Sequence, residues 1–590
     1  MSETLIVEHT GPDDAGRPNA RPLFGGGAPF ALRGPVDAEP GAILRVGAGD
    51  HAVTAVLAAA GTARAAIYRI LERFGVDPDH PPAARAEADA LVAAPGLDDP
   101  ALDDLRALPF VTIDGADSRD LDQALHVEGA EDGAAWVVRY ALADASYYVR
   151  PGSVLFDEAL ARGASYYLPG LVAPMLPRAL SEGIVSLNPD VERRALVLTM
   201  TVDRASGDCT ATAIGRARVR SHAKLSYDGV EAYYDAADRA AHPLAGKPWT
   251  AVLDGLEAVG RRRIARAEQK DIVCYNRVNV SVGLSPPAGT RFVAVDDPRN
   301  KTERYNEQIS LLCNIEGAKL LASAHGNGVR AIFRVHRPPS EPELGHLEEV
   351  IADIVAAHGL PPKVWRWRRR PNKKGPGESL ADYLDRLPQG GDTEPVYAAI
   401  NRQALMTNAR STFQAEPGLH YGVGAPVYAR FSSPMREVVG IFTHKEALDL
   451  LRGDEEPGDE ALQPRIIDAA NRAKELQRQL TKEANLLVID ELFAADLAAP
   501  IADRPARDGL VLGLSDDRLY VQLDDPPLEV KVYLKDVAQA IGATLRVEDH
   551  ARASLVGPGG AERALRVGDR IRLRVEGRDD ARRRWLLVPR

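Results

Sequence analysis

The chain has 590 residues, and 73 Lys and Arg against 84 Asp and Glu give it a formal net charge of −11. At roughly 100–200 residues per domain, this length predicts several domains, and 45% hydrophobic residues are typical of a folded protein. There is no apolar stretch long enough to cross a bilayer and no signal-peptide pattern at the start, so we expect a cytoplasmic protein. An acidic protein repels nucleic acid at long range, so an RNA or DNA partner would need a local basic surface.

The N-terminal region, residues 1–95, is predicted to be a small helical module with a mobile start over the first twenty residues. Apolar residues recur at helical spacing in Val53–Ala60 and again in Ile67–Phe74. Gly61-Thr62 supplies a break and an N-cap between the two segments. Two helices across a tight turn are typical of a helix-turn-helix or its winged form; the alternative is a helical hairpin packed on the next domain.

The remaining chain predicts an α+β multidomain protein with two further folded domains. Residues 103–450 alternate strands and helices without a clear linker, as expected for one large mixed α/β domain. Residues 451–500 combine an acidic loop with a long helix. Its apolar face contains Ile466, Ala470, Ala473, Leu476, Leu480, Ala484 and Leu487.

The C-terminal region, residues 501–590, changes to a period of two. Apolar residues alternate with polar ones in 519–523, 528–534 and 571–575, which predicts short strands and a small β-barrel of the OB type. The polar positions carry Lys, Arg and Tyr, as in barrels that bind single-stranded nucleic acid. Residues 563–590 add ten Arg against four acidic residues.

A cluster of acidic residues follows the short apolar strand predicted at 110–113. Carboxylates this close repel one another unless a cation lies between them, and Mg²⁺ prefers oxygen ligands. One alternative is a solvated acidic loop. Another is a calcium loop, but Arg119 and Leu125 stand where the EF-hand pattern needs Gly and Glu. The aspartates of this candidate magnesium site are Asp114, Asp117, Asp120 and Asp122.

This acidic segment resembles the signature of the ribonuclease II / ribonuclease R family of processive 3′-to-5′ exoribonucleases. Further motifs of the family follow in its order between residues 103 and 445. The C-terminal barrel is similar to the family's S1 RNA-binding domain. The motifs include 143–149, 162–170, 174–181, 224–227, 334–338, 420–424 and 428–436.

The resemblance implies roles for individual residues. Mg²⁺, with Mn²⁺ as an alternative, would be held by the aspartates of the cluster, and two such ions can activate a water molecule for phosphodiester hydrolysis. Catalysis would rest on Asp114, Asp120, Asp122 and Arg436, with Asp117 nearby. Arg436 would hold the scissile phosphate and Tyr167 would stack near the RNA 3′ end. Tyr227 and Glu307 would contact the last nucleotide, where ribose is distinguished from deoxyribose.

Three positions depart from the family pattern. Gln123 replaces a fourth aspartate; its amide oxygen can ligate magnesium but carries no charge, so we expect weaker metal binding unless Asp117 compensates. Glu437 replaces a second basic residue after Arg436, and Gly440 replaces a further aspartate. These departures motivate the main alternative, an RNA-binding protein with an inactive nuclease domain.

The N-terminal region also departs from the family, because about one hundred residues cannot hold the two cold-shock barrels that usually precede the catalytic domain. A smaller module would leave a wider entry for RNA. We therefore expect single-stranded RNA as substrate, and also RNA with duplex regions and a 3′ overhang, with no membrane and no obligate protein partner.

The sequence thus predicts a hydrolytic exoribonuclease that releases 5′-mononucleotides from RNA. A metal phosphodiesterase acting on DNA is a second alternative. One surface feature remains: Lys363–Lys374 holds seven cations and two tryptophans. This segment would either bind RNA or form a loop whose tryptophans pack beneath the arginine side chains.

Overall fold

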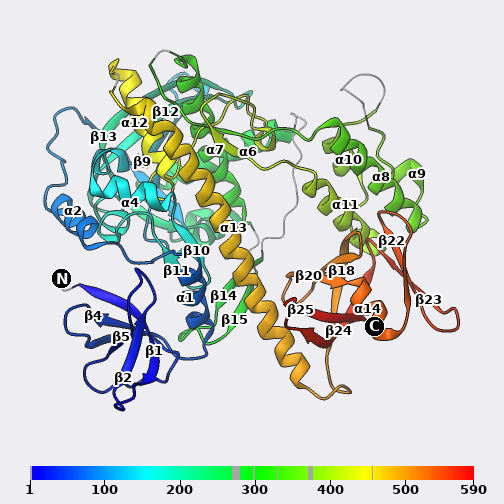
Figure 1. Ribbon diagram of the computed structural model, residues 1–590. Helices are drawn as coiled ribbons and strands as arrows, with labels where there is room; N and C mark the ends of the chain where they lie inside the picture. Colours follow the sequence, from blue (N-terminus) through cyan, green and yellow to red (C-terminus); the bar gives the residue numbers. More distant parts are fainter. Residues whose placement is uncertain (1–2, 269–279, 297–298, 327, 370–376, 455) are drawn as a thin grey trace.

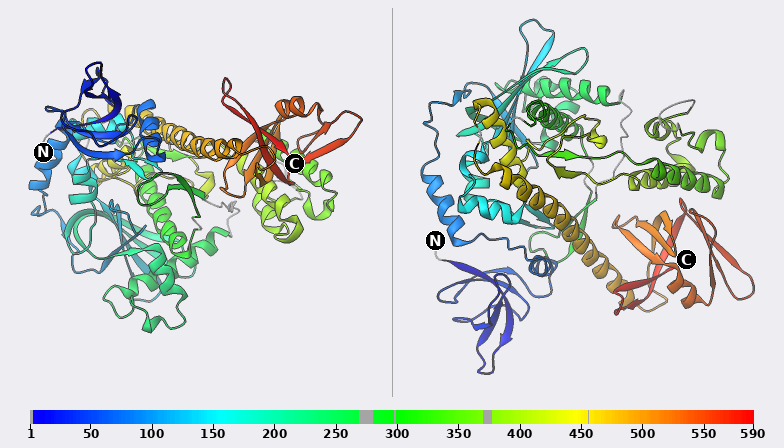
Figure 2. Two further views of the ribbon diagram at one scale, coloured as in Figure 1. Left: turned by 90° about the horizontal axis from the view of Figure 1, so that it is seen from below. Right: turned by 45° about the horizontal axis from the view of Figure 1, so that its top comes forward.

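The computed structural model describes residues 3–268, 280–296, 299–326, 328–369, 377–454 and 456–590 (Figure 1). An N-terminal sheet lies beside a large central part, and a C-terminal part of strands and helices lies on the other side (Figure 1). The 40-residue helix α13 (Asp459–Ala498) runs from the central part to the C-terminal strands in both views of Figure 2. Among the described helices, none combines the length and the apolar character that a membrane span requires.

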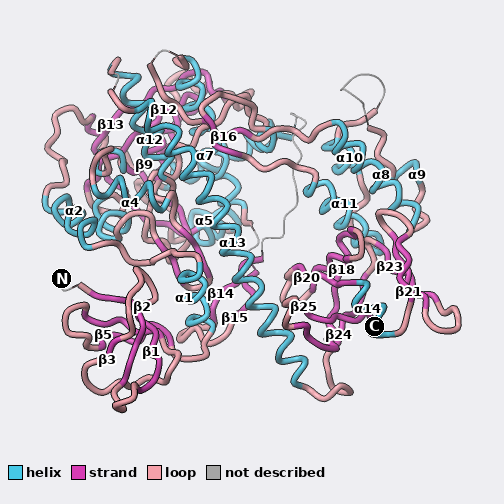
Figure 3. The backbone as a smooth tube through the Cα atoms, viewed as in Figure 1, coloured by secondary structure: helices cyan, strands magenta, loops and turns pink. Residues whose placement is uncertain are grey.

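The N-terminal region is mostly strands, so the prediction of a helical module is wrong (Figure 3). Residues predicted to be mobile form β1 and part of β2, and the segment predicted as the first helix forms the edge strand β5. The five strands form an antiparallel sheet in the order β3-β2-β1-β4-β5. They are β1 (Thr4–Pro12), β2 (Pro18–Pro22), β3 (Phe30–Ala31), β4 (Ile43–Gly47) and β5 (Val53–Ala58).

There is a physical reason why residues 53–58 form a strand and not the predicted helix. The apolar spacing from Val53 onward fits a helix, but Val53, Thr54 and Val56 are β-branched and favour a strand. Pairing with β4 decides between the two, because it satisfies the backbone of both segments. The second predicted helix is confirmed as α1 (Ala63–Arg73), where the Thr62 side chain accepts a hydrogen bond from Ala65 N as the N-cap.

The central part is built on a six-stranded sheet that closes on itself. The strand order is β12-β9-β8-β7-β13-β6, and β12 also pairs with β13. The 18-residue strand β13 makes this closure possible, since its first part pairs with β12 and its last part with β7. The strands are β6 (Asp103–Asp104), β7 (Phe110–Asp114), β8 (Gln123–Gly129), β9 (Ala135–Ala143), β12 (Glu192–Asp203) and β13 (Cys209–Ser226).

Helices cover both faces of this sheet, because successive side chains of a strand point to opposite faces. On one face, Val111 and Leu125 pack with residues of α5, α6 and α7. On the other, Phe110 and Ala141 pack with residues of α2, α4, α12 and α13. These helices are α2 (Pro82–Ala93), α3 (Ala145–Tyr148), α4 (Val154–Arg162), α5 (Tyr227–Asp235), α6 (Thr250–Glu268), α7 (Lys301–Ser323) and α12 (Val438–Arg452).

Short two-stranded sheets complete the central part. Two of them are formed by neighbouring strands, and the third joins strands on either side of four helices. The pairs are β10 (Tyr166–Leu168) with β11 (Leu171–Ala173), β14 (Val280–Leu284) with β15 (Phe292–Asp296), and β16 (Phe333–Val335) with β17 (Thr412–Gln414).

The four helices between β16 and β17 pack on the C-terminal strands. Ile351 and Ile400 from these helices share one hydrophobic core with Val511 and Leu573. Trp365 and Trp367 are buried in the same core, so they offer RNA no stacking surface. Arg370, Lys373 and Lys374 of the basic segment lie outside the described residues. The helices are α8 (Glu341–Ala357), α9 (Pro362–Trp365), α10 (Leu380–Arg386) and α11 (Glu394–Met406).

The C-terminal strands predicted from the period of two are confirmed, with Leu519, Val521, Val530 and Val532 buried as expected. They belong to a five-stranded sheet in the order β20-β19-β18-β24-β25, and a separate three-stranded sheet has the order β21-β22-β23. The elements are β18 (Ala506–Ser515), β19 (Arg518–Leu523), β20 (Glu529–Tyr533), α14 (Leu534–Ile541), β21 (Thr544–Val547), β22 (Arg552–Val556), β23 (Glu562–Arg566), β24 (Arg570–Asp579) and β25 (Arg584–Pro589).

Helix α13 contacts three regions in turn along the apolar face that the sequence predicts. Ile466 and Ala470 pack against the central part. Leu480 packs in a cluster with α1 and β10. Val488 and Phe493 enter the core of the C-terminal part. Since one continuous helix carries all of these contacts, it fixes the C-terminal strands relative to the central sheet.

Candidate active site

Asp114 and Tyr227 come together through the register of two parallel strands. Strand β7 ends at Asp114, which pairs with Ser226 at the end of β13. Helix α5 begins directly afterwards at Tyr227, with Ser226 as its N-cap. Asp114 Oδ1 accepts hydrogen bonds from Gly115 N at 2.7 Å and Ser118 Oγ at 2.9 Å. The second carboxylate oxygen, Oδ2, has no hydrogen bond to any described residue.

Buried Asp122 and half-buried Arg436 form an ion pair at the entry to β8. The Asp122 side chain is 1% exposed; its Oδ1 accepts from Met435 N at 3.0 Å, and its Oδ2 accepts from Arg436 Nε. Burial raises the pKa of Asp122 to about 6, and the Arg436 charge opposes this rise. Burial lowers the pKa of Arg436, but Asp122, Asp120 and Asp114 outweigh it and hold this pKa above its usual value. Arg436 is therefore the cation that interacts electrostatically with three aspartates of the acidic cluster.

One pocket of about 280 Å³ gathers six of the residues singled out by the sequence. They come from β7, β8, α5, α7 and the loop before α12, which are far apart in the chain. The six are Asp114, Asp122, Gln123, Tyr227, Glu307 and Arg436. Arg299, Asn306, Ser310, Arg430, Ser432 and Ser433 also line the pocket and were not assigned a role from the sequence.

The other three predicted residues lie outside this lining. The Tyr167 hydroxyl lies 3.4 Å from Asp120 Oδ2, and the Tyr167 side chain is exposed. Gln477 of α13 fixes the Tyr167 backbone, since its side chain accepts from Tyr167 N at 2.9 Å and donates to Tyr167 O at 3.0 Å. Asp117 is exposed on the loop after β7. Asp120 and Tyr167 both lie close enough to Arg436 to raise its pKa, whereas Asp117 has no hydrogen bond or ion pair with a described residue.

Residues from the N-terminal half of α7 line one part of the pocket. Glu307 pairs with Arg299 at 2.7 Å, and Asn306 Nδ2 donates to the Tyr227 hydroxyl at 3.4 Å. Asn300 caps the helix, which fixes where its first turn begins. This part of the pocket therefore offers a carboxylate, an amide and a phenol to whatever enters.

Gln123 is held by two neighbours. Its carbonyl oxygen accepts from the hydroxyl of buried Tyr140, and its amide donates to the Ser432 carbonyl. This arrangement explains why the family's carboxylate is absent, since a carboxylate would face the Ser432 oxygen without a proton to donate. One lone pair of the Gln123 oxygen is already used, so its capacity as a metal ligand is reduced.

We expect Gln123→Glu to lower the free energy of unfolding by about 1–3 kcal/mol, because it turns a satisfied donor into an acceptor opposite a carbonyl. Urea denaturation at neutral pH measures the change. Gln389→Glu, in an exposed loop where the side chain has no hydrogen bond to a described residue, is the matched control and should leave the stability nearly unchanged. A Gln123→Glu protein as stable as this control would contradict the hydrogen-bond assignment.

Glu437, the second departure, neutralises a pocket cation. Its carboxylate pairs with Arg430 at 3.0 Å. Burial raises the pKa of Glu437, but the charges of Arg430 and Arg334 more than offset this and hold the pKa below its usual value. Nearby on α13, burial lowers the pKa of the Lys474 ammonium to about 7, and Arg334 adds to this effect. Arg430 and Arg334 alone outnumber the one Glu437 carboxylate, so the environment behind the pocket is net positive.

Gly440, the third departure, allows α12 to approach the pocket segment closely. A Cβ at this position would lie 3.0 Å from Pro434 Cα and 3.1 Å from Ser433 O. The aspartate of the family pattern cannot fit here without displacing Ser433, which lines the pocket. The absence of that acid therefore follows from packing in this chain.

Gly440→Ala should cost about 1–3 kcal/mol of stability, because the added methyl group overpacks the segment. It should also slow RNA hydrolysis, because the added methyl group would displace Ser433, which lines the pocket. Gly345→Ala on α8 is the control, because its Cβ would have no neighbour closer than 3.9 Å and alanine favours the helix. Thermal unfolding compares the two variants, and equal melting temperatures would refute the packing argument.

Asn314 of α7 holds the pocket segment in place and was not foreseen from the sequence. Its side-chain oxygen accepts from Phe431 N at 2.7 Å and Ser432 N at 3.1 Å. Its amide donates to the hydroxyls of Tyr428 and Ser432, both at 2.9 Å. A buried asparagine with all of these bonds made positions the chain that leads to Arg436.

No histidine lines the pocket among the described residues. His444 is buried and its Nε2 contacts Phe431 O at 2.8 Å. His336 and His420 stack edge to face with ring centres 5.3 Å apart.

Comparison with known proteins identifies the family. Residues 102–488 match the RNB domain. The chain belongs to the RNB-domain family. It is 31% identical over 346 residues to ribonuclease R of Vibrio cholerae serotype O1, covering 58% of this chain and 39% of that protein. The chain thus spans about two fifths of the length of this relative.

Solved structures share the fold of this RNB-domain protein. Mycoplasma genitalium RNase R in complex with ribose-methylated single-stranded RNA has a TM-score of 0.78 at 17% identity, over 100% of this chain and 89% of that one. The same enzyme in complex with double-stranded RNA gives a TM-score of 0.73 at 17% identity, over 99% and 95%. The similarity extends over the N-terminal sheet and the C-terminal strands as well as the RNB domain.

Proposed function

We propose that this protein is a processive exoribonuclease that hydrolyses RNA from its 3′ end and releases 5′-mononucleotides. The observation that carries the proposal is the pocket in which Asp114 and Asp122 meet Arg436 and Tyr227. Membership of the RNB-domain family supports the reaction class. Direction and processivity rest on the resemblance to ribonuclease II and ribonuclease R.

The pocket's donor set fits magnesium, or manganese in its place. Carboxylate oxygens are the ligands that hard divalent ions prefer, and Asp114 Oδ2 is available. Asp114, Asp120 and Asp122 would hold the metal, with Gln123 and Asp117 as weaker contributors. Bound metal would activate water and stabilise the leaving oxygen of the phosphodiester.

The chain's own residues bind and orient the RNA end. Arg436 offers a planar guanidinium to the oxygens of the scissile phosphate, where negative charge grows during the reaction. Tyr167 presents an exposed ring beside Asp120 on which the terminal base can stack. Tyr227 and Glu307 line the same pocket, where a 2′-hydroxyl could hydrogen-bond. Such contacts would select RNA over DNA.

We propose that residues 501–590 act as an S1-like RNA-binding barrel of the OB type, and that residues 103–450 form the catalytic domain. On the polar face of the C-terminal sheet, Arg584 lies 4.0 Å from the centre of the Tyr533 ring. Lys531 lies 5.9 Å from the Tyr520 ring centre on the neighbouring strand. Aromatic rings beside cations suit stacked bases with their phosphates.

RNA with a duplex region and a 3′ overhang is a second proposed substrate. The similar Mycoplasma genitalium structure is a complex with double-stranded RNA, which supports this extension. A single five-stranded sheet stands before the catalytic domain here, in place of the two barrels that the family resemblance leads one to expect. Complete arrest at every duplex with a long 3′ tail would contradict the proposal.

The test identifies both direction and product. RNA labelled at the 5′ end, and separately at the 3′ end, is incubated with the protein and Mg²⁺. We expect the 3′ label to be released at once as a 5′-mononucleotide and the 5′ label to remain in shortening chains. A 5′-labelled DNA of the same sequence should resist. Tight RNA binding without any release would instead favour the inactive RNA-binding alternative, which Gln123, Glu437 and Gly440 motivate.

A further inference from the structure

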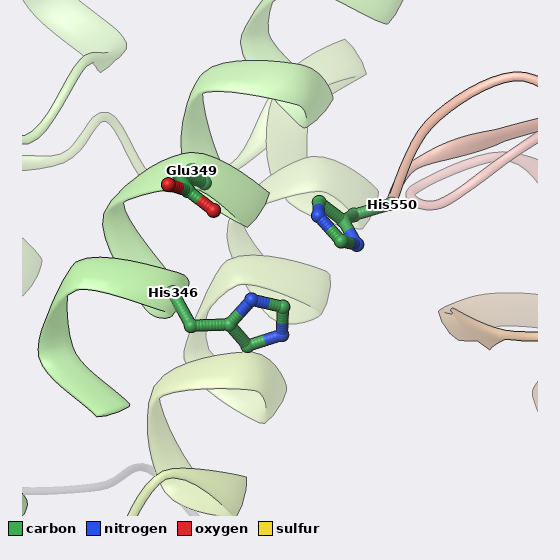
Figure 4. Close-up of side chains that lie close together, drawn as sticks. All are labelled: His346, Glu349 and His550. Carbon is green, nitrogen blue, oxygen red and sulfur yellow. The ribbon is translucent and has the colours of Figure 1, made fainter. Parts of the chain in front are cut away.

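Two histidines and a glutamate meet on the surface between α8 and the C-terminal hairpin. His346 and Glu349 come from α8, and His550 comes from the loop between β21 and β22 (Figure 4). One ligand atom from each of the three side chains lies within 4.8 Å of the others. The two imidazole rings face each other edge to face, with centres 4.8 Å apart. The site is remote in sequence and in lining residues from the aspartate pocket.

We propose that this trio is a binding site for Zn²⁺ or a similar late first-row divalent ion. Two neutral imidazoles and one carboxylate are a common three-ligand set for zinc, with water as the fourth ligand. Such ions prefer imidazole nitrogen, whereas Mg²⁺ prefers oxygen. The ligand set therefore separates this site chemically from the aspartate pocket.

The three side chains are free to bind. All three residues are exposed, and among the described residues the Glu349 carboxylate has no hydrogen bond or ion pair. Ligand atoms about 2.0–2.1 Å from a tetrahedral zinc lie roughly 3.3 Å apart, so small side-chain rotations would close the observed spacing. Exposed side chains make such rotations at little cost.

The local charge favours a cation. Helix α8 carries five acidic residues and no Lys or Arg. Two of the acids, Glu341 and Glu348, are paired with Arg369. Glu349 and Asp353 remain on the side that faces the hairpin. A negative helix raises the local concentration of divalent ions.

The hairpin loop is already positioned on α8. His550 N donates to Asp353 Oδ2 at 3.3 Å, which places the His550 ring over the preceding turn. About one turn further along from Asp353, Arg566 Nη1 donates to Ala357 O at 3.1 Å and His358 contacts Val567 O. A metal bound by the three side chains would thus add a further connection between the helices 341–406 and the three-stranded sheet. It would restrain the hairpin without taking part in RNA hydrolysis.

Zinc titration of the full chain tests the site. The protein is stripped of metal and titrated with Zn²⁺ in excess Mg²⁺, which occupies carboxylate sites but competes poorly for imidazole. We expect one equivalent of Zn²⁺ to bind and to raise the unfolding temperature. His346→Ala and His550→Ala should each weaken this binding by about 100-fold or more, because each removes a ligand outright. The visible spectrum with Co²⁺ should show nitrogen ligation in the native protein and lose it in both variants.

Two controls keep the outcome decisive. His325→Ala removes a histidine that contacts only one carboxylate, that of Glu416, and should bind Zn²⁺ as the native protein does. His346→Ala, on α8 and outside the proposed RNA-binding barrel, should keep its circular dichroism spectrum and its Mg²⁺-dependent activity on RNA. The proposal is overturned if the native protein binds no zinc under these conditions, or if both histidine variants retain the full equivalent.

Discussion

Arg436→Lys should reduce the rate of RNA hydrolysis by about 100-fold while leaving the fold intact. Lysine keeps the positive charge beside buried Asp122, so the ion pair survives. It loses the planar fork that can bind two phosphate oxygens at once, and with it a donor aimed at charge that develops in the transition state. Single-turnover cleavage of a short RNA measures the effect, with RNA binding determined at the same ionic strength.

The matched control for this prediction is Arg261→Lys. Arg261 is 65% exposed on α6 and pairs with Glu257 at 2.6 Å. The control should keep both the native rate and the native melting temperature. If Arg436→Lys hydrolyses RNA as fast as Arg261→Lys, a phosphate-binding role for Arg436 is wrong.

Lys445→Met should destabilise the protein by about 3–5 kcal/mol, because it removes the cation from a buried acidic cluster. Lys445 Nζ lies 2.7 Å from Asp449, 2.5 Å from Asp459 and 3.4 Å from Glu446. The three carboxylates are buried and lie within 4.8 Å of one another. Burial raises the pKa of Glu446, and the Lys445 charge opposes this rise. The ammonium thus takes the place that a metal ion would otherwise occupy.

Chemical denaturation of Lys445→Met is compared with that of Lys319→Met. Lys319 pairs with Glu316 at 2.8 Å, but its side chain is 48% exposed. Such a surface pair contributes about 0–1 kcal/mol, so its loss should be small. The loss of unfolding free energy caused by Lys445→Met should be smaller in acid, because protonation removes the negative charges of the three carboxylates. Equal effects of the two substitutions at neutral pH would refute a structural role for Lys445.

The sequence predicts helices and strands best where the spacing of the apolar residues fits only one type of secondary structure. The face of α13 and the alternating strands β19, β20 and β24 are of this kind. Residues 53–58 are not, since their spacing fits either structure and only pairing with β4 selects the strand. The helices 341–406 show a different limit: the sequence places them in the mixed α/β region 103–450, and nothing in it says that they pack on the C-terminal strands.

In the candidate site, too, some residues can be found from the sequence and others only from the structure. The Asp114–Asp122 cluster stands out because carboxylates of this density need a chemical reason, whereas Arg436 is singled out only by the resemblance to ribonuclease II and ribonuclease R. The neighbours that shape the pocket do not stand out. Tyr140 and Asn314 are ordinary residues of a strand and a helix, and only the folded chain brings them to Gln123 and to the segment before Arg436. Gly440 is likewise explained only by its distance to Pro434.

The most direct test of the central claim is a time course on 5′-labelled single-stranded RNA with Mg²⁺, run for the native protein beside Asp122→Asn. Asparagine keeps the size of the side chain and can still accept from Met435 N, but it loses the charge that metal binding and Arg436 require. We expect shortening from the 3′ end by the native protein and at least a roughly 1,000-fold slower reaction by the variant, with RNA binding retained. Equal shortening by both proteins would contradict the assignment of the active site to this pocket.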